Sequence, residues 1–516
     1  MFYFQSTGIA AERASLFSFD DSCFPFRKNV CVHMNKPIVR PEPVLTPGGP
    51  GEPDSLASHF YGTVLFDEGK FRMWYVGMSL GLNPDMPPED LEQLRVRKSL
   101  AKILQGPICY AESEDGIRWE KPNLGQLPFH GGKNNNAISF PDSIIHCPTL
   151  IKDEDDPDPS RRYKMVYQYY LHTEETNNWP TMRTATSPDG LHWTAGAKVP
   201  VKEFVEHCSF YKFNGYYIVN GHSSNGWRKG EGGSDRGRQG FAYISADFDS
   251  WLQETAESFA LPDPQDPAKR GQQGSYDQVH LGTAPMIYGN VAVGLYSIWH
   301  NSETFTEISG DFGLVLSDDG LRYREPVKGH VYLHSEQSLV TPHPDKYYHT
   351  VLCQANGFLN VGDETRIYHG RWRNTWNDVL DRYYGEIALA VLPRDRWGSM
   401  RLHSDQEEGS LWSSPVTLPQ RDFEFRVNAE GVQGIRIELS DEQFRPLAGF
   451  SGENGGIVRQ DGLESSMEWP GEPLERLAGR KVRIRVVFHR SGAEEPILYA
   501  VYGVSLSSVE PTPIGG

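Results

Sequence analysis

The chain has 516 residues, a length that suggests two or three domains. Hydrophobic residues make up 38% and charged residues 23%, which indicates a folded globular protein. The net charge of −18 argues against a nucleic-acid partner, because an acidic surface repels phosphate backbones. No apolar stretch approaches roughly 18 residues, and the first 17 residues lack a basic region followed by an apolar run. We therefore expect neither a membrane span nor a signal peptide.

Six cysteines are spread along the chain without any Cys-x-x-Cys pair. Few and dispersed cysteines in a long chain are typical of buried thiols in a reducing compartment. The sequence therefore predicts a cytoplasmic location.

One short pattern, Ser-x-Asp-Gly-x-x-Trp/Tyr, recurs along the first 330 residues. It occupies residues 113–119, 187–193 and 317–323, and a degenerate copy occupies residues 245–251. In each copy an apolar run leads into a turn, and an aromatic residue follows, which is the signature of a β-hairpin. The repeat predicts several similar β units.

Two further strands are predicted before each hairpin. Residues 62–66 and 71–75 are such a pair, and residues 210–213 and 216–219 form another around Asn214-Gly215. Two strands and a hairpin make a four-stranded unit, and a fifth unit without the motif runs from about residue 339 to 392. We therefore predict an all-β protein whose residues 46–402 form a five-bladed propeller. A helical insertion is predicted inside the first blade, from Pro88 to just before Gly106-Pro107, with apolar residues at 91, 94, 100, 103 and 104. It could be an oligomer contact or a wall beside the central site.

The composition changes near residue 400. Residues 403–409 are polar, and alternating strands follow at 423–427, 435–439 and 482–486. We predict that residues 403–516 form a C-terminal β-sandwich and that residues 1–45 pack on the propeller.

Residues just before the innermost strand of each blade converge on the axis of a propeller. Four of the five blades place a histidine there, and these are His59, His146, His207 and His280. Converging imidazoles commonly hold Zn, Mn or Fe, so the four are candidate metal ligands. The alternative is that each ring hydrogen-bonds a sugar hydroxyl or a neighbouring strand.

A resemblance adds to this pattern. The hairpin repeat, Met73-Trp74-Tyr75, Arg162-Tyr163-Lys164 and the trailing sandwich look like invertase-like and arabinanase-like glycosidases, of the glycosyl hydrolase family 32 and 43 type. That resemblance implies three axial carboxylates: a nucleophile or base from blade one, a stabilising Asp from blade two and a general acid Glu from blade three. Glu206 matches the acid. His59 stands at the blade-one position with Asp54 upstream, and His146 at the blade-two position with Asp142 nearby.

Three functions remain open at this point. The first is a glycoside hydrolase with Glu206 as general acid and Asp142 or Asp54 as its partner carboxylate. The second is a metal-dependent carbohydrate lyase or isomerase that uses the four histidines. The third is a carbohydrate-binding propeller without catalysis. In each case the partner is a carbohydrate, and assembly into a homo-oligomer remains an open possibility. Four residues are candidates for substrate binding: Tyr61, Trp74, Asp277 and Glu336.

Overall fold

The computed structural model describes residues 1–96, 102–142, 144–169, 180–223, 238–262, 277–300, 305–375, 382–490 and 494–506. Strands dominate these residues, and the α-helix among them is α1 (Pro88–Val96), so the prediction of a mostly β protein is confirmed. Within the described ranges, no helix is long and apolar enough to cross a membrane. All six cysteines are free thiols.

Residues 57–393 form successive antiparallel units, each of which matches one predicted blade. The first unit contains β7 (Ala57–Asp67), β8 (Lys70–Leu80) and β9 (Ile103–Ser113). The second contains β10 (Ile145–Lys152), β11 (Tyr163–Tyr169), β12 (Thr181–Ser187) and β13 (Thr194–Ala195). The third contains β14 (Val205–Phe213), β15 (Tyr216–Ser223), β16 (Gly240–Ser245) and β17 (Ala256–Phe259).

Two more units follow. The fourth contains β18 (Gln278–Ile287), β19 (Ala292–His300), β20 (Ser309–Ser317) and β21 (Val331–Leu333). The fifth contains β22 (Val351–Cys353), β23 (Phe358–Val361), β24 (Glu364–Arg373) and β25 (Tyr384–Pro393), with β6 (Ile38–Val39) at its edge.

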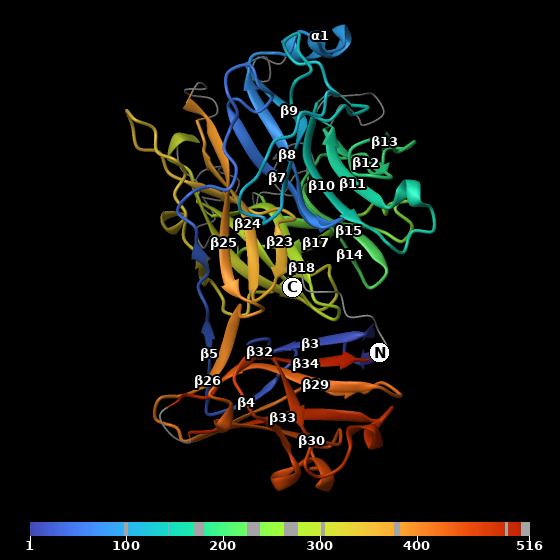
Figure 1. Ribbon diagram of the computed structural model, residues 1–516, viewed down its shortest axis with the longest axis vertical. Helices are drawn as coiled ribbons and strands as arrows, with labels where there is room; N and C mark the ends of the chain where they lie inside the picture. Colours follow the sequence, from blue (N-terminus) through green and yellow to red (C-terminus); the bar gives the residue numbers. More distant parts are fainter. Residues whose placement is uncertain are drawn as a thin grey trace.

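The five units close into a propeller-like ring. The first strands β7, β10, β14 and β18 contact one another in that order. Single parallel bridges join the fourth unit to the fifth, at Gly310 and Val351, and the fifth to the first, at Gly385 and Ala57. Figure 1 shows this ring as the upper part of the molecule, with α1 at its far end.

The hairpin repeat connects neighbouring blades. In residues 187–193 the Asp189 carboxylate accepts the backbone N–H groups of Leu191 (2.8 Å) and His192 (2.9 Å), and the Ser187 hydroxyl accepts that of Gly190 (2.9 Å). The turns at 113–119, 245–251 and 317–323 repeat this pattern. Backbone hydrogen bonds and neighbouring side chains hold the pKa of Asp189 at about 2, against the opposing effect of burial. The motif is therefore a self-contained turn.

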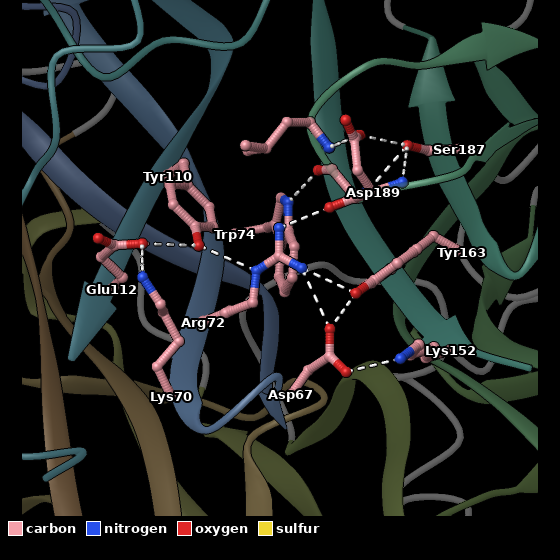
Figure 2. A network of polar contacts seen from close by, with 12 residues as sticks. Asp67, Lys70, Arg72, Trp74, Tyr110, Glu112, Lys152, Tyr163, Ser187 and Asp189 are labelled. Atoms are coloured by element: carbon pink, nitrogen blue, oxygen red, sulfur yellow. Dashed lines mark hydrogen bonds and ion pairs between the residues drawn. The ribbon is translucent and has the colours of Figure 1, made fainter. Parts of the chain in front are cut away.

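Figure 2 shows how one such turn docks on the neighbouring blade. The Arg72 guanidinium donates to the Asp189 carbonyl (2.6 Å) and to the hydroxyls of Tyr110 (2.9 Å) and Tyr163 (2.8 Å). It also pairs with the Asp67 carboxylate at 3.2 Å. The same contact recurs between the fifth and first blades, where Arg366 donates to the Asp115 carbonyl at 2.6 Å.

The strands after the ring form a second β region, drawn in orange and red below it in Figure 1. They are β26 (Gly398–Leu402), β27 (Glu408–Trp412), β28 (Val416–Thr417), β29 (Phe423–Glu430), β30 (Ile435–Ser440), β31 (Gly456–Val458), β32 (Gly462–Glu468), β33 (Lys481–His489) and β34 (Ile497–Ser505). Their inward side chains share one apolar core that includes Phe425, Ile437 and Val486. The assignment of this region as a β-sandwich stays a prediction.

The predicted domain boundaries differ from the strand pairing at both ends. Residues 1–45 supply five strands to the C-terminal network: β1 (Phe2–Phe4), β2 (Ile9–Ala11), β3 (Arg13–Phe17), β4 (Phe26–Lys28) and β5 (Val30–Met34). Of the strands in that segment, β6 pairs with the propeller. Strand β26, placed in the propeller by the sequence, pairs with β34 and β5. Strands β1 and β2 pair with each other, but β3, β4 and β5 pair with β34, β27 and β26. These partners are distant in the sequence, so a local pattern did not reveal where the early strands lie.

The predicted helical insertion is shorter than its apolar pattern suggests. Helix α1 ends at Val96, and Ile103 and Leu104 begin β9, where they pair with Leu80 and Ser79. Leu100 lies outside the described residues. Spacing alone could not separate a helical stripe from the start of a buried strand.

Candidate active site at the propeller axis

The four predicted histidines occupy equivalent places in the ring. Each lies near the start of a first strand, and in each strand the pairing shifts just after it, between His59 and Thr63, His146 and Thr149, His207 and Ser209, and His280 and Thr283. Such bulges bend a strand and redirect its side chains. The repeat at four positions indicates one shared feature of the inner strands.

Two polar side chains of the fifth blade form hydrogen bonds to the other blades near the histidines. The Asn356 amide donates to the Phe210 carbonyl (2.6 Å) of the third blade and to the Leu150 carbonyl (3.4 Å) of the second. The Gln354 amide donates to the carbonyls of His280 and Gly282 in the fourth blade, both at 2.7 Å. These contacts tie the second, third, fourth and fifth blades together.

Three of the four histidines gather around Tyr61. The ring centroid of Tyr61 lies 4.1 Å from that of His59, 4.9 Å from His146 and 6.1 Å from His280. His59 and His146 face each other nearly in parallel at 6.1 Å. Burial lowers the pKa of all three imidazoles, so they are neutral at pH 7 and can each donate and accept one hydrogen bond.

The fourth histidine does not join this group, which corrects the sequence prediction. His207 is fully buried, and its Nε2 lies 3.2 Å from the Val166 carbonyl of the second blade. Burial lowers its pKa to about 4. His207 follows Glu206 directly, and successive side chains of a strand point to opposite faces, which agrees with their different partners, Val166 for His207 and His222 for Glu206.

The predicted four-histidine metal site is therefore not assembled. Across the described ranges, no group of three or more His, Cys, Asp or Glu side chains is placed to hold a metal ion. The sequence pattern located equivalent backbone positions but not the side-chain directions that the bulges impose.

Glu206 lies at the start of β14 beside these rings, and its side chain is 21% exposed. His222 of β15, which the sequence analysis missed, is its cross-strand neighbour, and the His222 Nε2 lies 2.9 Å from Glu206 Oε2. The His146 Nδ1 lies 3.8 Å from the other oxygen, Oε1. Burial alone would raise the pKa of Glu206, but His222, with His146 and Arg238, holds that pKa well below its usual range. Glu206 is therefore an ionised carboxylate at neutral pH.

Aromatic rings from the fourth and fifth blades stand around the same cluster. The Trp299 ring lies 4.4 Å from that of His280, and the Trp372 ring lies nearly parallel to His280 at 5.9 Å. The Arg238 guanidinium lies over Trp299 at 4.7 Å. No motif marks Trp299 or Trp372, so a single sequence offers no signal that separates them from core aromatics.

Two predicted site residues have structural roles instead. The Asp54 side chain is fully buried and accepts hydrogen bonds from Tyr75 (2.7 Å), Ser58 (2.9 Å) and Lys121 (2.5 Å). Trp74 is also fully buried, and its indole N–H donates to the Gly190 carbonyl at 2.8 Å. Both side chains hold blade one in place, and neither is free to meet a substrate.

Asp142 lies at the rim between the first two blades. Its carboxylate accepts from the Tyr167 hydroxyl at 2.6 Å and lies 3.7 Å from Arg183. It lines a small, mostly apolar pocket together with Met86, Phe140 and other residues. Its partners come from blade two, and none of them contacts Glu206.

Asp277 and Glu336 lie at one corner of the fourth blade. Asp277 accepts from His300 at 3.0 Å, and His300 also lies 3.3 Å from Asp311. Asp311 in turn accepts the Ser335 backbone N–H at 2.7 Å, which places the exposed Glu336 beside this chain of groups. The two predicted substrate contacts therefore share a rim position.

Comparison with known proteins gives structural matches only. No protein-family model matches the sequence, and no curated protein matches it. The β-1,2-mannobiose phosphorylase of Listeria innocua, solved with β-1,2-mannobiose, is 13% identical, with a TM-score of 0.41 over 70% of this chain and 96% of that one. The α-L-arabinofuranosidase of Podospora anserina, solved with cellotriose, is 10% identical, with a TM-score of 0.42 over 70% and 98%.

Another matched structure belongs to the glycoside hydrolase family 130 of mannoside phosphorylases, which contains glycoside hydrolases that target β-1,2 mannosidic linkages in Candida mannan. It is 13% identical, with a TM-score of 0.41 over 73% of this chain and 96% of that one. The matched structures are thus those of glycoside hydrolases and a phosphorylase, all at low identity. Because the identities and TM-scores are this low, an activity can be inferred only from the residues of this chain.

Proposed function

We propose that the protein is a carbohydrate-active enzyme that cleaves a glycosidic bond at the axial cluster, with Glu206 as the reacting carboxylate. The observation that carries the proposal is the position of Glu206. It is partly exposed and ionised, and it lies where the first strands of the blades meet, among neutral imidazoles and aromatic rings.

The acidity of Glu206 determines which role it can take. A general acid needs a raised pKa, because it must hold a proton at working pH. The lowered pKa of Glu206 speaks against the role of general acid expected from the sequence. An ionised carboxylate instead activates an attacking water or stabilises the positive charge of an oxocarbenium-like transition state. We assign Glu206 this second kind of role.

The surrounding side chains suit a sugar. Flat rings such as Trp299, Trp372 and Tyr61 stack on the apolar face of a sugar ring, and neutral imidazoles exchange hydrogen bonds with hydroxyl groups. This is the non-metal alternative that the histidine pattern left open. The metal-dependent lyase or isomerase is not favoured, because the described donors do not form a metal site.

The test is a substitution of Glu206 measured against a panel of aryl glycosides and oligosaccharides, each with and without inorganic phosphate. Glu206→Gln keeps the size of the side chain, and we expect the chain to fold while turnover falls roughly 10²- to 10⁴-fold. The matched control is Glu254→Gln, an exposed carboxylate of the same blade. The phosphate arm separates hydrolysis from phosphorolysis.

A Glu206→Gln variant that keeps most of its turnover would overturn the assignment. Sugar binding by wild type and variant alike, with turnover by neither, would favour a carbohydrate-binding propeller without catalysis.

A further inference from the structure

Among the described residues, His222 is the closest polar side chain to the Glu206 carboxylate, and no motif or resemblance pointed to it. The two residues are directly opposite each other on β14 and β15. The His222 side chain is completely buried, whereas that of Glu206 is 21% exposed. The buried ring therefore lies behind the carboxylate, and the exposed side of Glu206 is left for a ligand.

The contact fixes the protonation of both groups. A carboxylate can only accept, so the Nε2 of His222 must carry the proton in the 2.9 Å contact. Burial lowers the pKa of the His222 imidazole. The ring is then neutral at pH 7 and acts as a hydrogen-bond donor rather than as a cation. Hydrogen bonds to a charged group are stronger than those between neutral groups.

Other titratable groups also surround Glu206, and their contributions differ in kind. The groups that interact electrostatically with Glu206 are His59, Tyr61, His146, Cys147, His207, Arg238, His280 and Cys353. Among them Arg238 is the permanent cation. The nearest imidazole besides His222 is that of His146, at 3.8 Å, which is beyond hydrogen-bond length.

We propose that His222 is a positioning residue that holds Glu206 Oε2 through a neutral N–H donor and leaves Oε1 for the reacting sugar. The inference rests on the proposed function and deepens it. Without this donor, only the weaker effects of His146 and Arg238 would oppose burial, so the pKa of Glu206 would rise and the protonated acid would become more favourable. His222 thereby decides that the carboxylate serves as a base or charge stabiliser.

The test pairs two substitutions of His222 with a control in the same blade. His222→Gln keeps an N–H donor without a titrating ring, and His222→Leu removes the donor. His207→Leu is the control, because His207 is equally buried but contacts the Val166 carbonyl instead. Each variant is made with Glu206 and with Glu206→Gln, and thermal unfolding is measured from pH 4 to pH 8. This measurement needs no substrate.

We expect the effect of Glu206→Gln on the unfolding midpoint to have the opposite sign in His222→Leu. The folded pKa of Glu206 lies below its unfolded value, so ionised Glu206 stabilises the wild type above the unfolded pKa and loses that effect as the pH falls. Glu206→Gln should therefore lower the unfolding midpoint at pH 7 in wild type, His222→Gln and His207→Leu. In His222→Leu it should raise the midpoint, because it removes a buried charge that has lost its donor.

An equal lowering of the midpoint in all four backgrounds would overturn the inference. If His222→Leu does not fold, His222→Asn, whose shorter amide cannot reach Oε2, takes its place. With the glycoside that the panel identifies, the acid limb of kcat/KM should move up by about one pH unit in His222→Leu, a roughly tenfold loss at fixed acidic pH. His222→Gln should restore it. Turnover retained by Glu206→Gln would instead defeat the proposed function and leave the unfolding result standing.

Discussion

The hairpin repeat and the axial cluster differ in how many hydrogen bonds their polar side chains form within the protein. In the network of Figure 2, Arg72 has four acceptors, Asp189 holds its own turn, and the chain of contacts ends in ion pairs at Lys152 and Lys70. At the axis, neutral imidazoles contact aromatic rings. Glu206 Oε2 lies 2.9 Å from His222, and among the described residues the nearest nitrogen to Oε1 is the His146 Nδ1 at 3.8 Å.

This difference separates residues that hold the ring together from residues that can react. A group whose hydrogen bonds are all used stabilises a fold but has nothing to offer a substrate. The most visible sequence motif belongs to the first kind. The residues with chemical capacity lie outside that motif. The positions of Glu206 and the histidines could be predicted, but their arrangement is formed only when the blades close into a ring.

The largest expected effect on stability follows from removing Arg72. Its side chain is 6% exposed and that of Asp67 9%, so Arg72→Ala leaves a buried carboxylate with Lys152 as its remaining cation. We expect a loss of about 3–5 kcal/mol in the free energy of unfolding, measured by denaturant titration. Arg118→Ala is the control, because Arg118 is 91% exposed in its pair with Asp115. It should cost about 0–1 kcal/mol.

If Arg72→Ala and Arg118→Ala cost the same, the buried network would not be what holds the first two blades together.

A smaller effect is expected from Gly190, the glycine of the second hairpin. It adopts a φ of +78°, and an added Cβ would lie 2.8 Å from Cζ2 of Trp74. Left-handed backbone costs a residue with a Cβ roughly 1–2 kcal/mol, and the clash adds to this, so Gly190→Ala should destabilise by about 2–4 kcal/mol. Gly125 has a φ of +65° and open space around it. Gly125→Ala should show the backbone cost alone, and equal losses at both sites would argue against the tight docking of the turn.

The smallest effect concerns the rim of the fourth blade. Hydrogen bonds to Asp277 and Asp311 raise the pKa of His300 to about 9. Because this folded pKa is above the unfolded value, the pair stabilises the protein fully below the unfolded pKa and loses that effect as the pH rises through about 9. The ring is 34% exposed, so solvent reduces the gain to about 1 kcal/mol or less. His300→Gln should flatten the fall of the unfolding midpoint between pH 7 and 9, and an unchanged slope would contradict the assignment.

The same contrast explains what the sequence could predict. A hairpin is a local structure, so Ser187, Asp189 and Gly190 announce their turn within a few residues, and the repetition of that turn predicts the ring. The histidine positions were also predictable, because they share a step in each blade. The directions of the rings were not, since they depend on neighbours in other blades, as with His207, whose ring contacts the Val166 carbonyl of the second blade.

Partners distant in sequence were out of reach for the same physical reason. Glu206 could be singled out by its place before a strand, but its pKa depends on His222 across a hairpin and on Arg238 beyond it. Asp54 looked available as a carboxylate until Lys121, 67 residues away in sequence, was seen to neutralise it. Pairings of this kind depend on tertiary structure, which a local pattern does not contain.

The central claim is that the side chains at the propeller axis carry out the reaction, whereas the hairpin turns stabilise the fold. The most direct test measures kcat/KM and the unfolding midpoint side by side for Glu206→Gln and Gly190→Ala, on the glycoside that the panel identifies. We predict that Glu206→Gln loses turnover by roughly 10²-fold or more at temperatures below its own lowered midpoint, where the chain is folded. We predict that Gly190→Ala clearly lowers the unfolding midpoint, and that at temperatures below this midpoint its kcat/KM equals that of the wild type. Full turnover in Glu206→Gln, or a matching loss of turnover in folded Gly190→Ala, would contradict it.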